Sequence, residues 1–281
     1  MKVHPQRSHV KGPASTPPAP ARIWGLLASE ADRVVLFRRA PSQWTRVYLW
    51  DTATDTLTPG SWFQERLYEW MSDLSPDGEH LLYAARNESK RQQALAMERY
   101  GVIMYDWTAL SKPPQVHAIG LWNASDGWSG GGAFQDSRTI LVNHTDLLKQ
   151  QLIRPPGFEI LHPTGTLRVD TFRVVLKRTG WHVTHQPRRW IGMGEADPFT
   201  LRKKSLELNF ICDQRYHRFV RYRWLADGPA PDLEGATWAD LDRRGRLLIA
   251  RAGRVFIWRG GQEAELADLN ADQPPRPAQP A

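Results

Sequence analysis

Three sets of residues in this sequence have types and spacings that could do chemistry, and the first lies around Ser129. Gly127, Ser129 and Gly131 fit the G-x-S-x-G pattern, in which a nucleophilic serine stands on a sharp turn between a buried strand and a helix. Here the preceding residues, "WNASD", do not read as a buried strand, and the following residues, "AFQDSRTILVN", read as a turn and a strand. We therefore predict a structural role for these glycines, which let two backbones approach closely.

The second set consists of three carboxylates that each follow a tryptophan closely, Asp73, Glu195 and Asp240. Two carboxyl groups that converge to within about 5 to 9 Å can hydrolyse a glycosidic bond. Asp73 and Asp240, however, occupy nearly equivalent positions of a repeated pattern, which favours a shared role in a turn or cap. A carbohydrate-active hydrolase with these acids at its centre is therefore the alternative hypothesis.

The third set is a basic region that we predict to bind an acidic partner, through Arg188, Arg189, Arg202, Lys203, Lys204, Arg215, His217, Arg221 and Arg223. In "RYHRFVRYRW" the charged residues alternate with Tyr216, Tyr222 and Trp224, which predicts a strand with one charged and one aromatic face. Arginines with interleaved aromatics suit phosphate contacts and base stacking. A solvated strand face, or one paired with acids of a neighbouring sheet, is the other interpretation.

Metal and cofactor sites are not predicted. The single cysteine, Cys212, excludes a multi-cysteine zinc site and an internal disulfide framework. His182 and His185 are three residues apart, so on a strand they point to opposite faces. The segment "SGGGAF" lacks the lysine and the following helix of a phosphate-binding loop.

Length and charge set limits on the class of protein. The 281 residues carry a formal net charge of +7 at pH 7, which favours acidic partners. Residues 1–21 (basic and Pro-rich) and residues 270–281 (Pro-rich) read as flexible tails around one domain of residues 22–269. The amino-terminal tail lacks the apolar stretch of a secretory signal, and no segment reaches the ~18 apolar residues of a membrane span. We therefore expect a cytoplasmic protein.

The elements that would position these residues recur along the chain. Short apolar runs with alternating polarity are separated by Gly, Pro, Asp and Asn, which is typical of many short strands. Comparable segments open at tryptophans spaced by about 50 residues, namely Trp24, Trp70, Trp128, Trp190 and Trp238. Five units of three to four antiparallel strands predict an all-β fold, a single five-bladed β-propeller, which leaves few free sheet edges.

The segments "LSPDGEHLLYAA" (74–85) and "RVYLWDTATDTLT" (46–58) resemble the WD40-like propeller repeats of the TolB type. In "SPDG", Pro76 presets one dihedral angle, Asp77 accepts local hydrogen bonds and Gly78 takes a positive φ. The segment 239–258 resembles the same pattern with "DRRG" in the turn. The resemblance implies a fold that often serves as an interaction scaffold, and it implies no reaction.

From these observations we predict a noncatalytic scaffold that binds an acidic macromolecule through one propeller face and the basic strand. A protein is the first choice of partner, and nucleic acid bound by the basic region is the second. The sequence predicts no cofactor, no metal and no membrane span.

Overall fold

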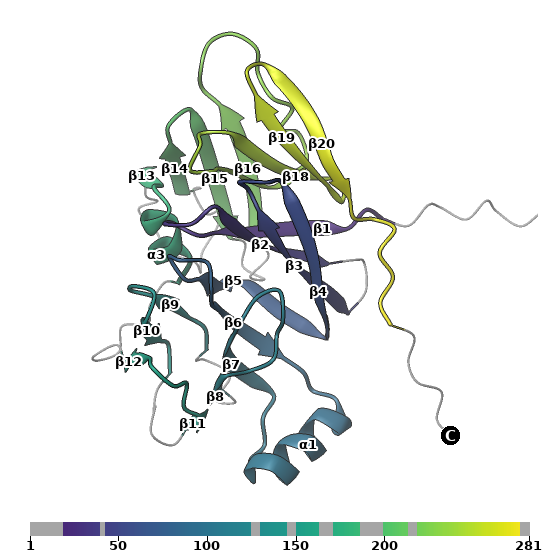
Figure 1. Cartoon of the computed structure of the whole chain (residues 1–281), viewed down its shortest axis with the longest axis vertical. Helices are drawn as coiled ribbons and strands as arrows, with labels where there is room; N and C mark the ends of the chain where they lie inside the picture. The colour runs from purple at the N-terminus through teal and green to yellow at the C-terminus, as the bar shows by residue number, and fades with distance from the viewer. Residues whose placement is uncertain are drawn as a thin grey trace, which may run out of the picture.

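The computed structural model describes residues 19–39, 43–124, 130–144, 150–162, 171–185, 199–212 and 218–275. Over these ranges the chain is mainly β-structure, arranged in five sheets of three to five strands (Figure 1). The prediction of an all-β protein built from five multi-stranded units is confirmed to this extent.

The first sheet is a regular antiparallel meander that runs in the order of the sequence. Its strands are β1 (Arg22–Leu27), β2 (Arg33–Arg39), β3 (Trp44–Asp51) and β4 (Thr56–Gln64). The fifth sheet has the same arrangement, with β17 (Ala236–Leu241), β18 (Leu247–Arg251), β19 (Arg254–Arg259) and β20 (Gln262–Asp268).

The second and third sheets share one stretch of chain. The second sheet contains β5 (Arg66–Leu74), β6 (Leu81–Arg86), β7 (Asp106–Ser111), β8 (Gly120–Asn123) and β11 (Gln151–Ile153). The third contains β9 (Gly132–Phe134), β10 (Thr139–Val142) and β12 (Glu159–Leu161). Because the chain returns to the second sheet as β11 before it forms β12, the second sheet has five strands and β10 pairs with β12 in parallel. Both features depart from the predicted antiparallel units of three to four strands.

The fourth sheet is antiparallel, with β13 (His182–His185), β14 (Phe199–Lys203), β15 (Leu206–Cys212) and β16 (Arg218–Trp224). Its first strand ends before Trp190, so the prediction that Trp190 opens the fourth unit is wrong. The buried Trp181 stands directly before β13 instead. Trp24, Trp70 and Trp238 do lie in the first strands of their sheets, β1, β5 and β17, whereas Trp128 and Trp190 lie outside the described residues.

Turns after the first strands follow the local chemistry expected from the sequence. In "SPDG", Gly78 has φ +71°, and Asp77 Oδ1 accepts hydrogen bonds from Ser75 Oγ and the Glu79 N–H. In the fifth sheet Asp242 Oδ1 accepts from the N–H groups of Arg244 and Arg246. The third sheet has the same device, in which Asp136 Oδ1 accepts hydrogen bonds from the N–H groups of Arg138 and Thr139, at 2.8 Å each.

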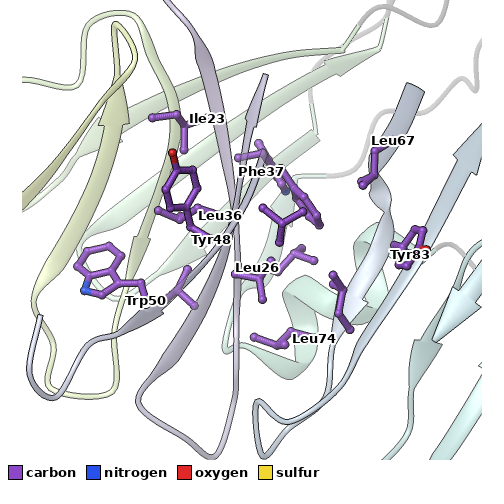
Figure 2. Close-up of a cluster of buried hydrophobic side chains, with 14 of the residues drawn as sticks. Ile23, Leu26, Leu36, Phe37, Tyr48, Trp50, Leu67, Leu74 and Tyr83 are labelled. Carbon is purple, nitrogen blue, oxygen red and sulfur yellow. The ribbon is translucent and has the colours of Figure 1, made fainter. Parts of the chain in front are cut away.

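The last sheet packs against the first. The ring of Trp238 lies so close to Gly25 that a Cβ on this glycine would be 2.4 Å from it. Thr237 Oγ1 donates to the carbonyl oxygen of Ile23 at 2.7 Å. Figure 2 shows that Tyr48 and Trp50 point to the side of the first sheet that faces the last one, while Phe37 points to the other side.

The packed chain continues past the boundary predicted at residue 269. Asn270 Oδ1 accepts a hydrogen bond from the Ala21 N–H at 3.0 Å, and Asp272 pairs with Arg46 at 3.0 Å. Arg38, which is buried, donates to the carbonyl oxygens of Leu269 and Asn270. Residues 270–272 are therefore held by the first sheet, because they supply acceptors for two of its arginines.

Within the described ranges, two helices interrupt the predicted all-β structure. Helix α1 (Lys90–Tyr100) lies between β6 and β7, with Ser89 as its N-cap and Gly101, at φ +67°, as its C-cap. Helix α3 (Thr171–Arg178) precedes β13 and contacts β5 and β9. In Figure 1, α1 projects at one end of the molecule, whereas α3 lies between β13 and β9.

Candidate binding surface

Asp73 near the end of β5 is fully buried and forms an ion pair with Arg178, the last residue of α3. The guanidinium donates to both carboxylate oxygens, at 2.8 and 2.5 Å, and also to the carbonyl oxygens of Leu74 and Phe134. The Phe134 N–H of β9 donates to the same carboxylate at 2.8 Å. Asp73 therefore joins α3 and the third sheet to the second.

Asp240 has a corresponding position in β17, because it pairs with Leu248 as Asp73 pairs with Leu82. The ammonium of Lys203, also buried, lies 2.6 Å from Asp240 Oδ1, and the indole N–H of Trp181 donates to Oδ2 at 3.2 Å. Both carboxylates thus bind side chains from the segment around α3. This agrees with the shared structural role inferred from their equivalent repeat positions.

The cavity beside Asp240 is narrowed by aromatic and aliphatic side chains. Its volume is about 20 Å³, and its lining includes Trp24, Trp70, Phe172, Trp181 and Trp238. That space is enough for about one water molecule and has no room for a sugar ring. Asp73 does not line this cavity, and Glu195 lies outside the described residues.

Arg178 and Trp181 are the partners that sequence reasoning missed. The signal for α3 was the helical spacing of Phe172, Val175 and Leu176, followed by Gly180 at the end. The β-branched pair in "RVVLKR" obscured it, because such residues also suit strands.

The segment after Ser129 supports the structural role proposed for its glycines, although Ser129 itself lies outside the described residues. Strand β9 follows, where a nucleophilic serine turn would need a helix. A Cβ on Gly131 would lie 2.5 Å from the carbonyl oxygen of Met71 in β5. Gly131 is required because the two backbones pass so close together.

One face of the fourth sheet carries three exposed arginines, and we call it the arginine face. It consists of Arg202, Glu207 and Arg223 in one row across β14, β15 and β16, and of Thr200, Asn209 and Arg221 in the next row. The side chains of Arg202 and Arg223 are 50% and 63% exposed, and Arg221 is also exposed. Neighbouring strands are about 4.8 Å apart, so these cations are close together.

Glu207 is the carboxylate at the centre of the arginine face. Its oxygens lie 3.0 Å from Arg202 Nε and 2.8 Å from Arg223. Burial acts to raise the pKa of Glu207, but the hydrogen bond from Arg202 and the charge of Arg223 outweigh it and lower the pKa. Glu207 therefore stays ionised and orients two arginines, while no carboxylate partner is present for Arg221 in the described part of the chain.

The other predicted binding residues differ in where they lie. Lys204 is exposed in the turn between β14 and β15. Lys203 does not belong to the binding surface, because its ammonium is buried against Asp240. The remaining four, Arg188, Arg189, Arg215 and His217, lie outside the described residues.

Tyr222 and Trp224 of β16 alternate with Arg221 and Arg223 and so lie on the opposite face of the strand from these two arginines. Tyr222 is buried, and burial raises the pKa of its hydroxyl. The six residues that define the arginine face include no aromatic side chain. These six residues can therefore bind anions through their three guanidinium groups.

Metal-binding groups are not gathered anywhere in the described ranges. These ranges contain no cluster of three or more His, Cys, Asp or Glu side chains with suitable positions. His182 and His185 are both exposed on β13. Among the same residues, neither the length nor the apolar character of any helix suffices to cross a bilayer.

Comparisons with known proteins assign no family. No family model and no curated protein match the sequence. Among solved structures, an acylaminoacyl peptidase of Pyrococcus horikoshii is 11% identical with a TM-score of 0.37, over 89% of this chain and 45% of the other. An uncharacterized protein of Listeria monocytogenes is 11% identical with a TM-score of 0.30, over 95% and 88%. The chain spans less than half the length of the peptidase.

Proposed function

We propose that the protein is a noncatalytic β-propeller scaffold that binds an acidic protein through the arginine face. The propeller arrangement is supported by five successive sheets and by the packing of β17 against β1. Helix α3 then lies at the centre, where its side chains contact β5 and β9. This arrangement leaves the arginine face of the fourth sheet exposed.

The arrangement of Arg202, Arg221 and Arg223 around a single carboxylate carries the proposal. Guanidinium groups bind carboxylates through paired hydrogen bonds, and Glu207 holds two of them in position. Arg221 is left to contact a partner. A protein partner is favoured over single-stranded nucleic acid because the six residues that define this face offer the bases no aromatic ring.

No observation favours the hydrolase hypothesis over this one. Asp73 and Asp240 each form an ion pair with a cation, and the cavity beside Asp240 is too small for a sugar ring.

The experiment measures binding of a polyglutamate peptide to the wild-type protein and to an Arg221→Glu, Arg223→Gln variant. Gln is chosen at 223 because Glu there would stand directly opposite Glu207. We expect the variant to lose at least about fivefold in affinity, and the wild-type affinity to fall between about 50 and 200 mM NaCl.

Arg243→Glu is the matched control, since Arg243 is equally exposed but lies in the turn between β17 and β18. It should bind the peptide like the wild type. Equal losses in both variants would show only a general charge effect and would refute the proposal. Tighter binding of a thymidine oligonucleotide through the same two arginines would replace the protein partner with nucleic acid.

A further inference from the structure

A second candidate site lies in a groove between the fourth and fifth sheets, on the opposite side of β16 from the arginine face. Its volume is about 510 Å³, and all its lining residues belong to the described chain. The lining comes from the end of β16 and the loop after it, from the turn between β17 and β18, and from the β19–β20 turn. These elements lie in the upper part of Figure 1. A groove of this size accommodates a small organic ligand.

Two tryptophans from neighbouring sheets form the apolar part of this groove, Trp224 at the end of β16 and Trp258 in β19. Both are partly buried, so each is fixed by the core and still presents part of its ring. A planar base stacks on such a ring, whatever the sequence of the nucleic acid.

The polar part of the groove contains cations and one carboxylate. Arg259 is exposed, and no ion pair with a carboxylate of the described chain holds it. Arg244 also lines the groove, where its guanidinium donates to the Ala53 carbonyl oxygen and lies 3.6 Å from Asp32. Asp227 is the exposed carboxylate among these residues.

Glycines allow a ligand to approach the backbone at the edge of the groove. Gly245, Gly260 and Gly261 all have positive φ, and no atom lies within 4 Å of where a Cβ on Gly260 would be. The glycine backbone of the β19–β20 turn therefore lies open to a ligand next to the arginines of the groove.

We propose that this groove binds a nucleotide, either free or as part of a single strand. The base stacks on Trp224 or Trp258, the phosphate binds Arg259, and Asp227 accepts hydrogen bonds from a ribose hydroxyl or an amino group of the base. The two tryptophans distinguish this ligand from an acidic peptide, whose carboxylates have no planar base to stack on them. The inference is independent of the protein partner proposed above, because it uses the other side of β16.

The test is calorimetric titration of the full chain with AMP, an RNA tetranucleotide of adenylates, inorganic phosphate and glucuronate. We expect AMP and the tetranucleotide to bind saturably and more tightly than phosphate. Arg259→Gln should weaken AMP binding about tenfold through loss of a charge-assisted hydrogen bond. Trp258→Leu should weaken it at least about fivefold through loss of stacking.

Arg254→Gln is the matched control, because Arg254 lies at the other end of the same strand and pairs with Glu265 and Asp268. It should bind AMP like the wild type. If Trp258→Leu fails to fold, the exposed Arg259 still decides the result. Equal effects at 254 and 259, absence of AMP binding, or equal binding of AMP, phosphate and glucuronate would each overturn the proposal. A preference for the tetranucleotide over AMP would identify a single strand as the source of the nucleotide.

Discussion

At the scale of single residues, buried carboxylates hold the centre of this molecule together. Asp73 and Asp240 are buried near the ends of β5 and β17 and bind Arg178 and Lys203. Breaking a buried ion pair is costly because the remaining charge has lost both water and its partner. These two carboxylates therefore stabilise the folded protein, and replacing them with neutral residues tests that role.

Asp73→Asn should lower the free energy of unfolding by about 3 kcal/mol, because it leaves the Arg178 guanidinium next to a neutral amide. The measurement is chemical denaturation followed by tryptophan fluorescence. Glu234→Gln, at an exposed position of the loop before β17, should change the stability by less than about 0.5 kcal/mol. Equal stability of the two variants would show that Asp73 does not stabilise the fold.

At the scale of elements, the stability of α1 depends more on the caps at its two ends than on burial of its side chains. Ser89 Oγ accepts a hydrogen bond from the Gln92 N–H at 3.2 Å, and Gly101 ends the helix in the left-handed region. Ala96 is the only residue of the helix that is fully buried. A helix with so little buried surface depends strongly on its caps.

Ser89→Ala should destabilise α1 by about 1 kcal/mol, because the first turn loses the acceptor for an N–H group. Hydrogen exchange of the amides in residues 90–100 should speed up while exchange in β17–β20 stays unchanged. Ser89→Asp, which retains an acceptor at this position, should preserve the slow exchange. Faster exchange across the whole chain in Ser89→Ala would contradict a local effect.

At the scale of the whole molecule, the first and last sheets depend on one close contact. Gly25 of β1 faces the ring of Trp238 in β17, and Thr237 bonds to the backbone of β1 beside it. Hydrogen bonds from Arg38 to the backbone after β20 reinforce the same junction. Chain segments from the two ends of the sequence thus stabilise each other.

Gly25→Ala should lower the stability by about 1 to 3 kcal/mol, because the new methyl group would overlap the indole of Trp238. Trp238→Leu removes the overlap, so the double variant should be more stable than the sum of the two single changes predicts. Denaturation of the four proteins in a double-mutant cycle measures this coupling. Additive losses would mean that the first and last sheets are not packed in solution.

Much of the local structure could be predicted from the sequence. Turns such as "SPDG" and "DRRG" were readable because Asp and Gly set the backbone conformation within four residues. The two faces of β16 were readable because side chains alternate along a strand. The cap of α1 was readable in principle from Ser89, Gln92 and Gly101, but the weak apolar pattern between them hid the helix.

The sequence by itself determined the strand-rich composition, the five-fold recurrence, the turn chemistry and the basic character of β16, since each depends on neighbours along the chain. Only the tertiary structure decided which charges are free: Lys203 is buried with Asp240, while Lys204 beside it is exposed. It also placed Trp224 and Trp258 in the lining of one groove, and Arg178 beside Asp73. The residues of such pairs are far apart in the chain. Packing between sheets brings them together, and no local sequence pattern records that packing.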